Sequence, residues 1–107
     1  MTTDIHAHRD ALAARAQENL QELIDTLEGK IGILSTLIEF PERSTTEQDR
    51  LKAKIRGIER GLTIAKGAIS PTIAHMEMAE LQSTMPLDEL PGFTIALQDA
   101  RLIARLP

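Results

Sequence analysis

Two stretches of the sequence carry matching apolar seams, and this match constrains the fold more than any other feature. Apolar residues recur at alternating spacings of four and three in both stretches. The first seam consists of Leu20, Ile24, Leu27, Ile31, Leu34 and Ile38, and the second of Leu51, Ile55, Ile58, Leu62, Ala65 and Ile69. Such heptad spacing is typical of helices that pack lengthwise against one another.

The matched seams predict an antiparallel helical hairpin, packed in the manner of a coiled coil. When the chain folds back at the turn between Phe40 and Thr46, Ile38 faces Leu51 at the turn and Leu20 faces Ile69 at the far end. The four layers between them fall into register without a slip. Burial of each large apolar side chain stabilises such a pairing by about 1.5–3 kcal/mol.

Breaker and capping residues divide the chain, which we interpret as a single helical domain spanning residues 1–107. Pro41 ends the first apolar pattern, and Ser44 with Glu47 has the spacing of a capping box that starts the next helix. Ser70 and Pro71 form a second start signal, as an N-cap and a first helical residue. We therefore expect helices at 4–40, 46–69, 71–84 and 93–106, with a turn at 41–45 and a loop at 85–92.

Composition favours an all-α fold. The chain has no valine, tryptophan or tyrosine, and Phe40 and Phe93 are its only aromatic residues, so the residues that favour strands are mainly isoleucine and threonine. Leu23 and Leu37 widen the apolar face of the first helix beyond what the hairpin covers. We expect either the shorter C-terminal helices or a second copy of the chain to complete a four-helix-bundle-like domain or dimer.

A stripe of small residues marks one flank of the second predicted helix. It consists of Ala53, Gly57, Gly61, Ala65 and Ala68. Glycine inside a helix costs about 1 kcal/mol relative to alanine, whereas a small-residue stripe lets another helix approach closely. We interpret the stripe, together with Leu23 and Leu37, as a helix-packing interface. A solvated face that tolerates glycine is the alternative.

The same stretch concentrates positive charge. Residues 50–66 hold six cations and one anion, a balance of +5 that leaves −9 for the remainder of a chain with net charge −4. The cations are Arg50, Lys52, Lys54, Arg56, Arg60 and Lys66. They are either compensated by acids of neighbouring helices or available to an anionic partner, protein or nucleic acid. A solvated or internally compensated face is favoured over either partner, and the absence of aromatic residues from the run argues against single-strand binding.

Residues for catalysis or for holding a metal show no recognisable pattern. The chain has no cysteine and no Gly-x-Ser-x-Gly motif. His6 and His8 would point apart on a helix, and His75 lacks the His-Glu-x-x-His spacing of a zinc site. We expect no enzymatic activity, cofactor or metal. No apolar run approaches the roughly 18 residues of a membrane span, and the polar N-terminus favours a cytoplasmic location.

These features favour a non-enzymatic protein–protein interaction module, such as a small adaptor, an assembly factor or a structural subunit. We expect it to act through helix–helix packing with a protein partner or with itself, a homo-oligomer and in particular a dimer being favoured. Two alternatives remain open. One is a nucleic-acid-associated regulator that uses the basic 50–66 helix face, and the other is a small acidic inhibitor of another protein.

Overall fold

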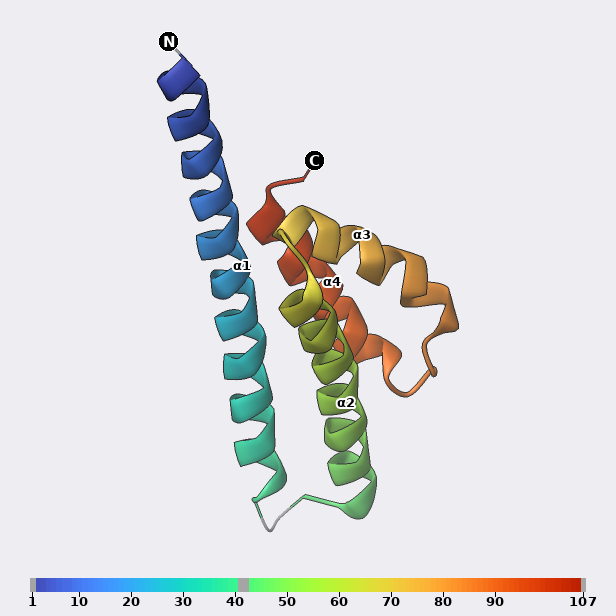
Figure 1. Cartoon of the computed structure of the whole chain (residues 1–107). Helices are drawn as coiled ribbons and strands as arrows, with labels where there is room; N and C mark the ends of the chain where they lie inside the picture. Colours follow the sequence, from blue (N-terminus) through green and yellow to red (C-terminus); the bar gives the residue numbers. More distant parts are fainter. Residues whose placement is uncertain (1, 41–42, 107) are drawn as a thin grey trace.

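The computed structural model describes residues 2–40 and 43–106, with side chains from Arg9 onward, and the described residues contain four α-helices and no strand (Figure 1). The helices are α1 (Thr2–Ile38), α2 (Thr45–Gly67), α3 (Pro71–Leu81) and α4 (Leu90–Ala104), and a 3-10 helix, η1 (Gln82–Thr84), follows α3. The prediction of an all-α, bundle-like fold is confirmed. No described helix is both long and apolar enough to cross a membrane. The side chains of His6 and His8, and part of the predicted turn at 41–45, lie outside the described residues.

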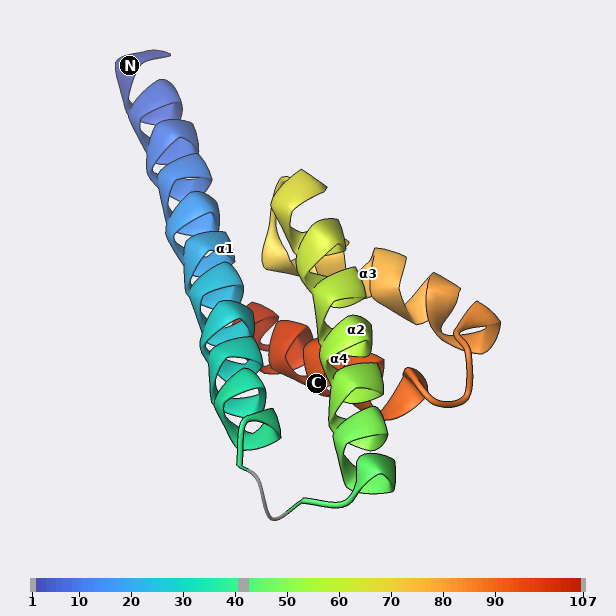
Figure 2. The same ribbon diagram turned by 90° about the horizontal axis from the view of Figure 1, so that it is seen from below.

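The first two helices form the predicted antiparallel hairpin (Figures 1 and 2). Its second helix starts where the capping signal indicates, since the Ser44 hydroxyl accepts a hydrogen bond from the Glu47 backbone N–H at 3.2 Å. Leu27 and Ile58 are fully buried, and Leu62 is nearly so. Seam residues of both helices therefore meet in one core.

The expected outermost layer of the hairpin, Leu20 facing Ile69, is wrong. The helix α2 ends at Gly67, and Ala68 already has an extended backbone conformation. The chain then turns toward Ser70, which caps α3 through its hydroxyl. As a result Ile69 is 78% exposed. The helix start signal at Ser70 and Pro71 therefore ends α2 before the apolar seam reaches Ile69.

The C-terminal helix α4 covers the surplus apolar face of the hairpin. It contacts both α1 and α2, and Phe93, Ala96 and Ala100 on its inner side are fully buried. Leu23 of α1 is also fully buried in the same cluster. An ion pair of 2.5 Å between Lys30 and Asp99 joins α1 to α4 at the surface. The covering element is thus a helix of the same chain.

The predicted loop at 85–92 is wrong in its last part, because α4 begins at Leu90. Pro91 lies in the first turn of α4, where a helix needs no backbone N–H donor from it. Gly92 follows inside the helix and is buried. The remaining bounds differ from the expected ones by one to three residues at helix ends. The helix α1 begins at Thr2 and ends at Ile38, α2 begins at Thr45 and ends at Gly67, α4 ends at Ala104, and the expected 71–84 helix becomes 3-10 in its last turn.

We predict that Ile58→Asp abolishes cooperative unfolding, because it places an unpaired carboxylate at a fully buried position, a change that costs several kcal/mol. The neighbouring substitution Glu59→Lys is a matched control, since Glu59 is exposed on the same helix turn. Thermal denaturation followed by far-ultraviolet circular dichroism measures both. A cooperative melt of Ile58→Asp near the wild-type temperature would contradict the core position of this residue.

Candidate functional site at the junction of α2 and α4

The small-residue stripe of α2 lies directly against α4. A Cβ atom added at Gly57 would overlap the carbonyl oxygen of Glu89 and lie 2.6 Å from the backbone nitrogen of Phe93. A Cβ atom added at Gly61 would overlap the Cβ atom of Ala96. Neither glycine can be replaced without a shift of the α4 backbone or of a rigid methyl group. The close contact of the two helices therefore explains why α2 carries glycine at these positions.

The helix α4 meets α2 with a small-residue stripe of its own. Gly92, Ala96 and Ala100 recur at a spacing of four residues and are all buried. A Cβ atom added at Gly92 would overlap the carbonyl oxygen of Lys54. The contacts advance along both helices in the same direction, from Lys54 and Gly92 to Gly61 and Ala96. Sequence inspection missed this second stripe because Gly92 stood next to Pro91 and looked like part of a loop.

The residues predicted as a helix-packing interface separate into two groups. Ala53, Gly57, Gly61, Ala65 and Leu23 are buried, whereas Ala68 and Leu37 are half-buried. Ala68 is the C-cap of α2, and Leu37 lies in the last turn of α1. The stripe packs closely against α4, a helix of the same chain. Where α4 covers it, the stripe is therefore not accessible to a partner protein.

The buried carboxylate of Glu89 joins the start of α4 to α2 through ion pairs. Glu89, only 7% exposed, forms ion pairs with Arg56 at 3.7 Å and with Arg60, whose Nε also donates a hydrogen bond to it. This hydrogen bond and the negative charge of Glu89 raise the pKa of Arg60. Asp88 adds an exposed ion pair of 3.3 Å to Arg56. Two of the six predicted cations, Arg56 and Arg60, thus have acidic partners in the structure. Both partners, Asp88 and Glu89, lie in the segment that the sequence predicted as the 85–92 loop.

The six cations of the predicted anionic-partner face do not act as one surface. Besides Arg56 and Arg60, Lys66 has a partner, since it lies 3.5 Å from Glu28 of α1. Arg50, Lys52 and Lys54 form no ion pair with any described residue. The C-terminal part of the run is therefore internally compensated, and the uncompensated charge is confined to the N-terminal half of α2.

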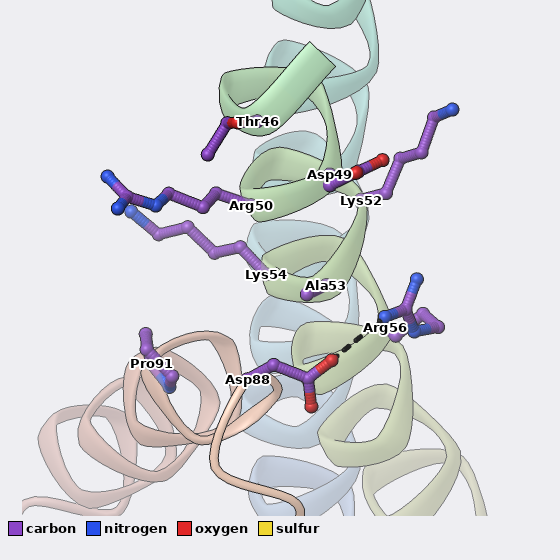
Figure 3. A pocket seen from close by; sticks show the side chains of 9 residues that line it. All are labelled: Thr46, Asp49, Arg50, Lys52, Ala53, Lys54, Arg56, Asp88 and Pro91. Atoms are coloured by element: carbon purple, nitrogen blue, oxygen red, sulfur yellow. Dashed lines mark hydrogen bonds and ion pairs between the residues drawn. The ribbon is translucent and has the colours of Figure 1, made fainter.

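An open groove lies where α2 extends past the start of α4 (Figure 3). It has a volume of about 660 Å³ and is lined by Thr46, Asp49, Arg50, Lys52, Ala53, Lys54, Arg56, Asp88 and Pro91. The side chains of Arg50 and Lys54, one helical turn apart, extend in the same direction on the side of Pro91, whereas Lys52 points away from them (Figure 3). We call this the cationic groove.

The chemistry of the cationic groove suits an anion. The donors that form no ion pair with a described residue are the guanidinium of Arg50 and the ammonium groups of Lys52 and Lys54. Such groups bind carboxylates or phosphates through charge-assisted hydrogen bonds. Within the described part of the chain, no three residues among His, Asp and Glu lie in an arrangement that could hold a metal ion. Comparison with protein-family models, curated proteins and solved structures finds no match to this chain.

We predict opposite effects for two glycine-to-alanine substitutions. Gly61→Ala introduces a methyl group against Ala96 and should destabilise the fold by about 1–3 kcal/mol through overpacking. Gly32→Ala, with nothing within 4 Å of the new methyl group, should stabilise it by up to about 1 kcal/mol through helix propensity. Urea denaturation measures both free energies of unfolding. Equal effects of the two substitutions would contradict the close contact of α2 with α4.

We further predict that Glu89→Gln destabilises the protein more than Asp88→Asn does. Glu89 is buried between two arginines, whereas the Asp88 side chain is 62% exposed and forms an ion pair with Arg56. Loss of the buried acceptor charge should cost about 1–3 kcal/mol, and loss of the exposed pair less than about 1 kcal/mol. Denaturation in urea compares them, and a larger loss for Asp88→Asn would contradict the assigned role of Glu89.

Proposed function

We propose that the protein is a non-enzymatic helical interaction module that associates with a second copy of itself through the N-terminal end of α1. The observation that carries this proposal is the length of α1. With 37 residues it is about 55 Å long, and it projects beyond the rest of the bundle (Figure 1). The longest dimension of the molecule is 65 Å, against 27 and 22 Å for the others.

The apolar stripe of α1 continues into this projecting end. Leu12 and Ala16 stand on the same helix face as Leu20, Leu23 and Leu27, which pack in the core or against it. All residues from 9 to 15 are exposed, and Leu12 is 52% exposed. Over residues 9–15, the face that α4 and α2 cover further along the helix is thus not covered by any described residue.

Packing against a partner would stabilise this projecting helix end. Isolated helices shorter than about 12–15 residues are marginal in water, and packing of an amphipathic face supplies most of the stability of helices in proteins. The segment is rich in alanine, at positions 11, 13, 14 and 16. Alanine favours the helix and leaves room for a neighbouring backbone.

A second copy of the chain is the occupant that fits this end best. The same unpartnered length exists on each copy, so a two-fold contact covers both at once. The net charge of the segment is small, because Arg9 and Arg15 offset two of the three acids Asp4, Asp10 and Glu18 and leave −1 for residues 2–18. Two copies therefore meet here with less repulsion than the −4 charge of the whole chain would impose.

We predict that Leu12→Glu converts the dimer into a monomer. The control is Leu87→Glu, which makes the same change at a residue 86% exposed in the segment between η1 and α4. Light scattering with refractive-index detection gives the solution mass, and this detector is needed because the chain has no tryptophan or tyrosine. A monomeric wild-type protein, or a dimer that both variants preserve, would contradict the proposal.

A further inference from the structure

We propose that the cationic groove binds an acidic segment of a partner protein. This inference goes beyond self-association, because the groove lies at the start of α2 whereas the projecting end of α1 lies at the opposite end of the hairpin (Figure 1). The two proposals rest on different residues.

The positive charge of the groove favours binding of an anion. Arg50 and Lys54 stand four residues apart on one helix face and share no carboxylate partner among the described residues. Like charges at this spacing repel each other. The remaining arginine of the wall, Arg56, is held by Asp88 and Glu89, so the free positive charge is concentrated on the Arg50 and Lys54 side. A carboxylate between these two groups would relieve their repulsion.

The shape of the groove suits a peptide segment. Ala53, 3% exposed, lines the groove and is the first residue of the stripe that α4 covers further along. The groove thus lies along α2 beyond the N-terminal end of α4. Lys54 also lines a smaller hollow with Ile33, Leu34 and Ile95, and Ile33 is 65% exposed. A segment that carries both carboxylates and aliphatic side chains can engage both hollows.

Three features favour a peptide over nucleic acid. The carboxylates of Asp49 and Asp88 lie on the groove wall, where they would repel a continuous phosphate backbone but leave room for isolated acidic side chains. None of the lining residues is aromatic, whereas aromatic side chains are the usual stacking platforms for single-stranded nucleic acid. The charge is also too localised for a duplex to contact many phosphates at once.

The test uses the full chain and a fluorescein-labelled twelve-residue peptide of glutamate and leucine, with binding followed by fluorescence anisotropy at low salt. The double variant Arg50→Gln/Lys54→Gln should weaken binding at least about fivefold, the equivalent of roughly 1 kcal/mol for partly exposed ion pairs. The matched control Lys66→Gln/Arg105→Gln removes the same charge at the other ends of α2 and α4 and should leave the affinity unchanged. Circular dichroism confirms that both variants are folded.

Three results would overturn the proposal. Equal weakening in both double variants would show that net charge alone attracts the peptide. Tighter binding of a DNA oligonucleotide of the same total charge, lost in the groove variant, would assign the groove to nucleic acid instead. Absence of peptide binding at low salt would remove the site. Each readout is independent of the solution mass, so a failure here is distinguishable from a failure of the dimer proposal.

Discussion

The backbone contact between α2 and α4 is the constraint on which the rest of the structure depends. Gly57 and Gly92 allow each helix to approach a carbonyl group of the other, and Gly61 accommodates the methyl group of Ala96. At this separation α4 also reaches α1, where Leu23 is fully buried. A larger side chain at the contact would separate the layers, because packed interiors have little free volume to absorb it. The hairpin seam alone leaves that face of α1 open.

The charges of α2 follow from the same contact. Because α4 begins against Lys54, the residues just before it, Asp88 and Glu89, lie beside Arg56 and Arg60. This neutralises the middle of the basic run, whereas the cations at its beginning form no ion pair with a described residue. Burial of Glu89 without both arginines would be costly, since an unpaired buried carboxylate loses its hydration. The ion pairs thus fix where α4 starts along α2.

Sequence patterns predicted the local features of this fold and missed the long-range ones. The heptad seams and the caps at Ser44 and Ser70 are signals within a few residues, and they predicted the hairpin and the starts of α2 and α3. The pairing of Arg60 with Glu89 joins residues 29 positions apart, so a linear charge count could not reveal it. The stripe of α2 was visible because its spacing is regular, whereas Gly92 was hidden by its neighbour Pro91. The exposure of Ile69 shows that a continued apolar spacing does not extend a helix past a strong start signal.

Both proposed surfaces arise from unequal helix lengths. The helices α1, α2 and α4 contain 37, 23 and 15 residues, so they cannot cover one another completely. At one end α1 extends past its neighbours with an apolar face, and at the other end α2 extends past α4 with a cationic one. An apolar face without a cover favours a like surface, because burial removes both from water. A cationic face favours a partner of opposite charge. The same length mismatch therefore accounts for both proposed contacts, which differ in chemistry and lie at opposite ends of one small bundle.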